Sequence, residues 1–513
     1  MRNLLVLFVF FLQFGLLVEG QATFQRTYGT SSNDLCSFVH QTSDSGFILA
    51  GLMLGDLSLI KINSIGDTIW TRSYGTVDND AAYSVQQTFD GGYILLGEEG
   101  YHDRIYLIRT NAIGDTLWAK VFSWGVFSDY GLCVKQTTDS GFIISGTTFL
   151  VGGNQMCAIK TNSFGDTLWT RVFKTNGSPW ASNIEQTFDG GFIMVGTTLT
   201  TSFSDDVYCI RLNSLGDTLW TKSYGGIGND IGSCIRQTQD SGFIIVGASS
   251  SFGSSINDYD LYLLKTNASG DTLWTRTLGD TASTQGGNFV SMTKDSSFIV
   301  CGSSRQNILL CKVNLNGDTL WTRTYGSSLS DGAFCVYQTI DSGYIIGGAT
   351  WNYGAGASDA YIIKTDSNGI SSCNLINQHI NFEHPPTDIR SENVQQLSAT
   401  CYLDNVFITI KSGVITSDAC MTSVIENNKV QNFEIITFPN PAATTFTISS
   451  PQSFIKSISI FNILGEEVLL SQTASNNLKP LQVTIDVSSF PSSIYFVLVE
   501  TGNGIAVQKL VKQ

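Results

Sequence analysis

Short apolar runs alternate with polar turns along most of the chain, and the alternation repeats about every fifty residues. In the second copy the apolar runs cover residues 82–88, 93–97, 105–110 and 116–122, and the turns between them are rich in Gly, Asp and Asn. Gly supplies the positive φ that tight turns need, and Asp caps the turn backbone. The runs are nearly continuously apolar, which is typical of strands covered on both faces. We therefore predict four short strands per repeat, with each sheet packed between two neighbours.

Two signatures mark the repeat. The first, Asp-(Ser/Gly)-(Gly/Ser)-(Phe/Tyr)-Ile, begins at Asp44, Asp90, Asp139, Asp189, Asp240, Asp295 and Asp341. The second, Gly-Asp-Thr-(Ile/Leu)-Trp, begins at Gly66, Gly114, Gly165, Gly216, Gly270 and Gly317. Four short strands in a period near fifty residues are typical of one β-propeller blade.

The chain has seven copies of the first signature and six of the second. The segment Phe24-Gln25-Arg26-Thr27-Tyr28-Gly29 matches the strand that follows each Trp, with Phe24 in the Trp place, and the last repeat stops at Gly369 without such a strand. We therefore predict that the N-terminal strand completes the last blade and closes the ring, which removes two exposed sheet edges. The predicted fold is all-β, a seven-bladed propeller over residues 21–370.

The repeated Trp residues have two interpretations. They are Trp70, Trp118, Trp169, Trp220, Trp274 and Trp321. A ring of ligand-stacking aromatics is one interpretation, but repetition at a single strand position favours packing between blades. The strand–turn–Trp pattern resembles the tryptophan-docking repeat of quinoprotein-type propellers, without an adjacent Cys-Cys pair or a calcium-ligand set.

The length of the repeat varies in one place. From each signature Gly to the next signature Asp the distance is 24 or 25 residues, whereas from Asp to the following Gly it ranges from 22 to 30. The variation therefore falls between the second and third strands, so one face of the ring carries variable loops, where scaffolds commonly place recognition. Aromatic residues on that face are the predicted binding residues for a glycan or a protein: Trp180, Trp351, Tyr353, Tyr101 and Tyr259. The alternative is that they only pack the loops.

A recurrent Asp precedes the first strand of five repeats, and we interpret it as a loop cap. The five are Asp34, Asp80, Asp129, Asp230 and Asp331. A ring of carboxylates that binds a structural cation is the alternative, and no motif supports it; no other cofactor is predicted.

No catalytic motif is present, so we predict a binding protein. The alternative function is a secreted hydrolase or lyase, acting on polysaccharide or peptide through loop carboxylates of the variable face.

The net charge and the N-terminal sequence indicate which partners and which cellular location to expect. A formal net charge of −15 and a pI near 4.6 argue against nucleic acid as a partner. Residues 1–20 have the basic start, apolar stretch and small-residue end of a signal peptide, and no later run is long enough to span a membrane. Cysteines within the repeats are predicted to be small buried residues. Downstream of the repeats, Cys373, Cys401 and Cys420 are candidates for a disulfide, with Cys401 and Cys420 as the suggested pair.

Beyond residue 370 the repeat ends. Residues 371–432 are polar and are interpreted as a linker or a small β extension. Residues 433–513 carry the motifs Phe438-Pro439-Asn440-Pro441, Ile463-Leu464-Gly465, Ile494-Tyr495-Phe496 and the ending Gln508-Lys509-Leu510-Val511-Lys512-Gln513. These residues, in this order and at this end, resemble the type A C-terminal sorting domain of the type IX secretion system of Bacteroidota. Ser493 departs from the Gly usual in that family.

The resemblance implies a small Ig-like β-sandwich that the secretion machinery recognises, and a protein that is released or attached at the outer cell surface. The repeat region also looks like the Trp-repeat propellers often fused to this domain.

Overall fold

The computed structural model describes residues 21–371 apart from short gaps at 54, 76–79, 100–103, 125–127, 151–152, 176, 200–203, 253–257, 280–283 and 327–328, seven short strands between 375 and 418, and residues 436–512 apart from 439–443, 450–454, 463–466, 473–481 and 502–503. The predicted signal peptide, residues 1–20, lies outside the described residues. Contacts divide the chain into two units, Met1–Met421 and Thr422–Gln513. No helix in the described part of the chain is long and apolar enough to span a membrane.

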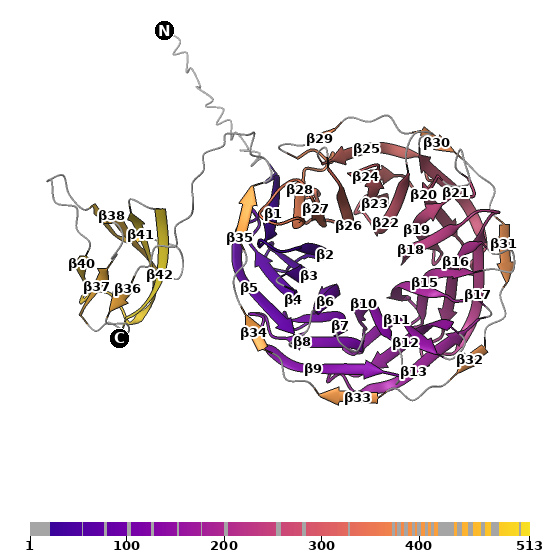
Figure 1. The fold of residues 1–513 in the computed structure, drawn as a ribbon, viewed down its shortest axis with the longest axis horizontal. Coiled ribbons are helices and arrows are strands. Elements are labelled where there is room, and N and C mark those ends of the chain that lie inside the picture. The colour runs from indigo at the N-terminus through magenta and orange to yellow at the C-terminus, as the bar shows by residue number, and fades with distance from the viewer. Residues whose placement is uncertain are drawn as a thin grey trace, which may run out of the picture. The chain divides into compact units, whose positions relative to one another are not determined.

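Seven antiparallel sheets form a closed ring in the first unit (Figure 1). We call the strands of each blade A to D from the axis outward. Blade 1 contains β2 (Leu35–Gln41), β3 (Phe47–Met53), β4 (Asp56–Ile62) and β5 (Thr68–Gly75). Blade 2 contains β6 (Ala81–Gln87), β7 (Tyr93–Glu99), β8 (Arg104–Thr110) and β9 (Thr116–Ser123). Blade 3 contains β10 (Asp129–Gln136), β11 (Phe142–Leu150), β12 (Gly153–Thr161) and β13 (Thr167–Lys174).

The remaining blades repeat this order. Blade 4 contains β14 (Trp180–Gln186), β15 (Phe192–Leu199), β16 (Asp205–Leu212) and β17 (Thr218–Gly225). Blade 5 contains β18 (Asp230–Gln237), β19 (Phe243–Ser249), β20 (Asp260–Thr266) and β21 (Thr272–Gly279). Blade 6 contains β22 (Gln285–Met292), β23 (Phe298–Ser304), β24 (Asn307–Val313) and β25 (Thr319–Tyr325). Blade 7 contains β26 (Asp331–Gln338), β27 (Tyr344–Thr350), β28 (Asp359–Thr365) and β1 (Phe24–Gly29). The predicted seven-bladed propeller is confirmed.

The N-terminal strand closes the ring. Strand β1 pairs antiparallel with β28, from Phe24 opposite Lys364 to Tyr28 opposite Ala360. Phe24 packs edge-on against Phe47 of blade 1, with ring centroids 6.3 Å apart, as each Trp packs against the next blade. The predicted closure is therefore confirmed, and Phe24 takes the packing role of Trp.

Interblade packing explains the repeated Trp residues. Trp70, Trp118, Trp169, Trp220 and Trp321 each meet an aromatic ring at the start of strand B in the next blade, at centroid distances of 5.7 to 6.0 Å. On the same strands, basic side chains reach the next blade, as in the 2.6 Å pair between Lys222 and Asp271. These Trp residues belong to the scaffold.

A second repeated contact lies inside each blade. The signature Asp of every A–B turn pairs with a buried Lys or Arg of strand C: Lys61, Arg109, Lys160, Arg211, Lys265, Lys312 and Lys364. Burial alone would raise the pKa of Asp240, but hydrogen bonds from Lys265 and Thr238 hold it below its usual value. The signature Asp therefore neutralises a buried cation as well as forming a turn.

The segment that follows the repeats encircles the propeller. Its strands are β29 (Leu375–Ile376), β30 (Asn381–Glu383), β31 (Asp388–Ser391), β32 (Gln395–Leu397), β33 (Tyr402–Asn405), β34 (Thr409–Lys411) and β35 (Ile415–Asp418). Each adds a fifth strand to one blade, antiparallel to strand D, in the order of blades 6, 5, 4, 3, 2, 1 and 7. We call these seven strands the belt (Figure 1, orange arrows on the rim).

The belt strands are regularly spaced along the chain. Successive belt strands begin six or seven residues apart. Within the segment 371–432, interpreted from the sequence as a linker or a small β extension, the seven belt strands belong to the propeller unit. They cover the outer edge of every sheet, which would otherwise be free to pair with another chain.

The second unit has two small sheets. One contains β36 (Ile436–Phe438), β37 (Thr445–Ser449) and β40 (Gln482–Asp486). The other contains β38 (Ile455–Phe461), β39 (Glu467–Gln472), β41 (Ser493–Thr501) and β42 (Gly504–Lys512). Phe446 and Ile448 of the first sheet share a buried cluster with Ile460 and Val497 of the second, so the two sheets pack face to face.

Candidate ligand-binding cavity on the ring axis

Every strand A carries a β-bulge near its start. The register with strand B shifts at the same place in all seven blades, for example between Ala181 and Asn183 of blade 4. A bulge bends the strand and re-aims a side chain. The seven bulged residues are Ser37, Tyr83, Leu132, Ser182, Ser233, Asn288 and Phe334. All seven line one cavity of about 490 Å³, which lies within the usual size of ligand pockets.

The position of the cavity along the axis follows from the strand direction. Strand A starts on the face where strand B ends and strand C begins, which is the face of the variable loops. The lining residues come from the first half of strand A, such as Leu35 and Phe38 of the strand Leu35–Gln41. The cavity therefore lies at the variable-loop end of the ring axis.

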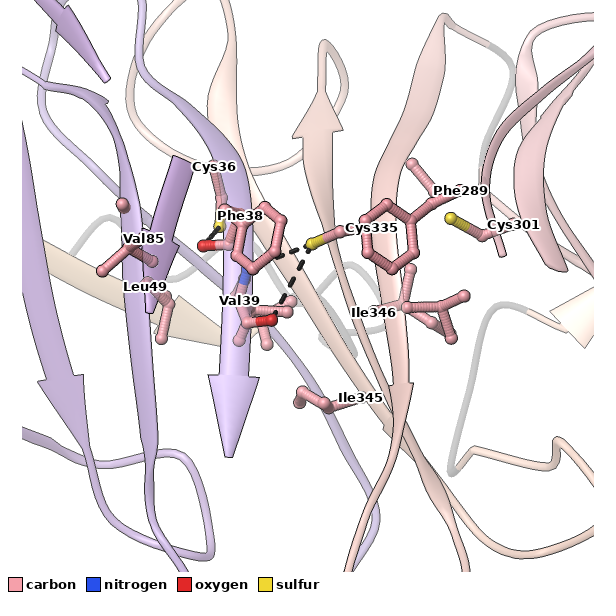
Figure 2. Close-up of a cluster of buried hydrophobic side chains, with 14 of the residues drawn as sticks. Cys36, Phe38, Val39, Leu49, Val85, Phe289, Cys301, Cys335, Ile345 and Ile346 are labelled. Carbon is pink, nitrogen blue, oxygen red and sulfur yellow. Dashed lines mark hydrogen bonds between the residues drawn. The ribbon is translucent and has the colours of Figure 1, made fainter. Parts of the chain in front are cut away.

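The residue after each bulge forms the next layer, and its members meet on the axis. Phe38 of blade 1 and Phe289 of blade 6 contact each other edge-on at 5.7 Å, although blade 7 separates their blades. Figure 2 shows these rings together with Cys335 of blade 7. Cys335 accepts a hydrogen bond from the backbone amide of Val39 across the joint between blades 7 and 1, at 3.0 Å. Contacts between blades that are not neighbours are possible only at the axis, so Phe38 and Phe289, which also line the cavity, lie on the axis.

Two residues further along strand A, one position differs in every blade. It holds His40, Gln86, Lys135, Glu185, Arg236, Ser291 and Tyr337. The Nζ atom of Lys135 lies 5.1 Å from the centroid of the Phe38 ring, which belongs to a blade two places away. The guanidinium of Arg236 lies 4.6 Å from the Phe289 centroid, and its Nη1 donates to Asn183 Oδ1 at 2.7 Å. Both cations therefore touch residues of the cavity wall.

The charges of this layer are only partly balanced. Glu185 accepts a hydrogen bond from the backbone amide of Gln237 at 3.1 Å. Neither Lys135 nor Arg236 makes an ion pair with a described residue, and Arg236 Nη2 is buried with no hydrogen-bond acceptor among them. Burial lowers the pKa of Lys135 and raises that of Glu185. Burial, assisted by the charge of Lys135, lowers the pKa of His40 to about 4, so His40 is neutral at pH 7.

The last residue of strand A connects the blades. A Gln side chain of one blade accepts from a backbone amide in the A–B turn of the preceding blade, as Gln237 does from Phe188 at 2.7 Å. The others are Gln41, Gln87, Gln136, Gln186 and Gln338. Gln41 accepts from Ile340 and thus links blade 7 to blade 1. Strand A therefore contains a position that differs in every blade, followed in six blades by a Gln that links the blade to its neighbour.

The aromatic residues predicted to bind ligand do not form one cluster. Trp180 is 46% exposed, and its ring lies tilted against that of Tyr130 with centroids 5.8 Å apart. It precedes the wall residues Ala181 and Ser182. Trp351 is exposed on blade 7, three blades away, where Tyr353 packs against Tyr361.

The hydroxyl oxygen of Tyr259 accepts a 3.3 Å hydrogen bond from the side-chain amide of Asn229. Tyr101 lies outside the described residues. Of the five predicted residues, Trp180 therefore lies beside the cavity wall.

The recurrent Asp before strand A is buried and caps the connection from the preceding blade. Asp230 accepts from the amide of Gly226 at 2.8 Å and the hydroxyl of Ser251 at 2.6 Å, and Asp129 accepts from Ser123 and Trp124. Within the described residues, no group of three or more His, Cys, Asp or Glu side chains could hold a metal ion. The geometry of these Asp residues therefore agrees with turn capping.

The cysteines within the repeats are buried free thiols, as predicted: Cys36, Cys133, Cys157, Cys209, Cys234, Cys301, Cys311 and Cys335. The suggested partners Cys401 and Cys420 lie outside the described residues.

The sorting motif falls mainly at strand ends of the second unit. Tyr495 of β41 is buried, and its hydroxyl donates to the carbonyl of Pro491 at 2.9 Å. Lys512 of β42 is also buried. Phe438 ends β36 and Lys509 lies in β42, whereas Pro439, Asn440, Pro441 and Gly465 lie outside the described residues.

The comparison with protein families decides the role of this unit. Residues 437–513 match the family model described as "Secretion system C-terminal sorting domain". The C-terminal unit is a type IX sorting domain. The protein is therefore secreted across the outer membrane to the cell surface or beyond, and the sorting domain matched over residues 437–513 implies interaction with the secretion machinery.

No curated protein matches the sequence. Among solved structures, the chain is similar to PorZ, a surface component of the type IX secretion system of Porphyromonas gingivalis, at 10% identity and a TM-score of 0.40, covering 94% of this chain and 60% of that one. Drosophila Plexin A, solved with Semaphorin 1b, matches at 8% identity and a TM-score of 0.41, covering 66% and 86% of the two chains. A prolyl endopeptidase matches at 12% identity and a TM-score of 0.41, covering 82% of this chain and 55% of that one.

The residues of the axis were not predicted, because the prediction rested on loop length and on aromatic residues near the variable loops. The signal was available in the aligned copies of strand A. The residue before the final Gln (Met292 in blade 6) differs in all seven copies, while the strand C cation is always Lys or Arg.

Proposed function

We propose that this protein is a secreted or cell-surface binding module that takes part of a glycan or protein ligand into the cavity on its axis. The observation that carries the proposal is the cavity wall, to which every blade contributes a bulged side chain that varies in size and polarity. Seven similar blades thus surround one asymmetric site, and binding sites are typically concave and mostly apolar with a few polar groups.

The chemistry of the wall supports binding rather than hydrolysis. The described residues that line the cavity carry apolar, aromatic, hydroxyl, thiol or amide side chains, and none is a carboxylate. Glycoside hydrolysis ordinarily needs two carboxyl groups flanking the scissile bond. Trp180 at the rim adds an exposed aromatic face that suits a sugar ring or an apolar side chain.

The test is to fill the cavity. In Ser233→Trp a bulged residue of the wall becomes large, and we expect loss of ligand binding by the full chain on a glycan array and in pull-downs of surface proteins. Leu215→Trp is the matched control, because Leu215 is 66% exposed in a C–D turn on the opposite face. Trp180→Ala should weaken binding less than Ser233→Trp does.

Binding that survives Ser233→Trp would overturn the cavity as the site. Turnover of a bound polysaccharide or peptide would overturn the assignment as a binding module and favour a hydrolase or lyase.

A further inference from the structure

The bulged residues of the cavity wall differ in size, and the small ones face each other across the ring. Three are small and lie on blades 1, 4 and 5: Ser37, Ser182 and Ser233. Four are large and lie on blades 2, 3, 6 and 7: Tyr83, Leu132, Asn288 and Phe334. Blade 1 lies across the ring from blades 4 and 5 (Figure 1). Because Ser leaves more room than the four large side chains, the cavity is a slot that runs from blade 1 to the joint of blades 4 and 5, with a flank on either side.

The hydroxyl groups at the two ends of the slot are available to a ligand. The three serines are partly exposed, and none of their hydroxyls makes a hydrogen bond with another described residue. The scaffold instead holds polar groups of the flanks. The Tyr83 hydroxyl donates to Glu98 at 2.8 Å, and the side-chain amide of Asn288 donates to the carbonyl of Ala333 at 2.7 Å. The ends of the slot therefore offer hydrogen bonds, and the flanks offer mainly the surfaces of rings and carbon chains.

The chemistry of the slot distinguishes between classes of ligand. No described lining residue carries a charge, so a charged group would be desolvated there without a partner. An apolar side chain would remove three hydroxyls from water without replacing their hydrogen bonds. A pyranose ring with equatorial hydroxyls has C–H groups on both faces and hydroxyls around its edge, and each hydroxyl donates and accepts as that of Ser does. Such a ring matches both the flanks and the ends of the slot.

We propose that the cavity binds a neutral pyranose residue with equatorial hydroxyls, such as a glucose unit of a polysaccharide, with its faces against the flanks and its edge against the three serines. Phe334 of blade 7 is 38% exposed and supplies an aromatic surface for one face of the ring. Trp180 offers a second aromatic surface beside the cavity wall. This inference rests on the proposed binding function and specifies its ligand.

The test compares two oligosaccharides that differ in the configuration of one hydroxyl per sugar. We would titrate the full chain by calorimetry with cellotriose, whose ring hydroxyls are all equatorial, and with β-linked mannotriose, whose 2-hydroxyls are axial and would point at a flank. Cellotriose should bind roughly tenfold more tightly, because the axial hydroxyl loses its hydrogen bond against the flank. A β-linked triglucuronate, which adds carboxylates, and a tripeptide of Ala, Leu and Phe form the other two arms.

Variants assign the effect to the ends and flanks of the slot. Ser182→Ala and Ser233→Ala each remove one hydroxyl and should each weaken binding of cellotriose roughly three- to tenfold. Phe334→Ala should weaken it by a similar factor, because one face of the ring loses its aromatic contact. Ser214→Ala is the matched control and should leave binding unchanged, since Ser214 is exposed in a C–D turn on the opposite face. Ala is smaller than Ser, so these variants should keep the fold, and their melting temperatures check this.

The outcomes separate this inference from the proposed function. Equal binding of cellotriose and mannotriose, or unchanged binding in both Ser→Ala variants, would refute the slot, and loss of that binding in Ser233→Trp would leave the binding cavity standing. Tighter binding of the triglucuronate or the tripeptide would refute a neutral sugar. Absence of binding to cellotriose, with a cavity-dependent signal on the glycan array or in pull-downs, would refute this ligand alone. Absence of any cavity-dependent binding would refute both.

Discussion

The cations of strand C and the residues near the end of strand A occupy equivalent places in seven blades, yet they follow opposite rules. At the strand C position every blade has Lys or Arg, each paired with an Asp in the same blade. At the strand A position the seven residues all differ, and the cations Lys135 and Arg236 make no ion pair within the described chain.

The difference shows which part of a repeat carries the scaffold and which part is free to specialise. A contact made inside each blade, or between each blade and the next, must be repeated for the ring to close evenly. The residues at the variable strand A position make different contacts in different blades, so each can change separately. We call the repeated contacts of strands C and D and the belt the shell, and the variable positions of strand A the axis. We expect substitutions in the shell to affect stability, and substitutions on the axis to affect binding.

Removing the belt should have the largest effect on the shell. A chain that ends at residue 371 loses all seven belt strands and exposes the outer edge of every strand D. We expect a lower melting temperature, faster amide exchange in strands such as β5 and β9, and concentration-dependent association through the exposed edges. Hydrogen exchange with mass spectrometry and light scattering would measure this.

A chain that ends at residue 421 is the control, because it lacks only the sorting domain and keeps the belt. Equal exchange in the two truncated chains would show that the belt does not protect the sheets.

Breaking one shell ion pair should cost less, though still measurably. Lys265→Met removes hydrogen bonds from Nζ to Asp240 and to the carbonyl of Thr266, which lie at 2.8 and 2.9 Å. We expect a loss of about 2 kcal/mol in the free energy of unfolding, since a buried carbonyl loses its donor while Asp240 remains partly solvated. Urea unfolding would measure this loss, and a change near zero would show that the ion pair does not stabilise the scaffold.

His40, at the variable strand A position of blade 1, should make the stability of the protein depend on pH. Its pKa is lowered from 6.5 to about 4 in the folded chain, so between these values the unfolded chain binds the extra proton. The contribution of His40 to stability is therefore complete above pH 6.5 and is lost as the pH falls toward 4. Between pH 7 and pH 5 the loss should be about 2 kcal/mol.

In His40→Gln this part of the pH dependence should disappear, as measured by urea unfolding at both pH values. The signature Asp carboxylates can be distinguished from His40, because their pKa values are lowered, to about 2 for Asp295. The stability that they contribute is therefore lost at a more acidic pH than the stability contributed by His40. An unchanged pH dependence in His40→Gln would show that His40 titrates normally.

Much of the scaffold was predictable because it repeats. The strands predicted at 93–97 and 105–110 correspond to β7 (Tyr93–Glu99) and β8 (Arg104–Thr110). The belt was not predicted, because strands of two to four residues such as β29 and β30 have no apolar pattern of their own and depend on pairing with an existing edge. The axial site was missed because a bulge shifts the register by one residue, and only the closed ring brings Lys135 to Phe38.

The smallest expected effect on stability is that of Lys135→Met. It is also the most informative, because its sign should be opposite to that of Lys265→Met. Lys135→Met removes a buried ammonium that makes no ion pair and replaces it with an apolar side chain of similar length. We expect unfolding to become about 1 kcal/mol less favourable, since the cost of desolvating the charge disappears. Urea unfolding of Lys135→Met beside Lys265→Met would measure the contrast. If both variants were destabilised equally, Lys135 would belong to the scaffold, and the distinction between shell and axis would fail at this residue.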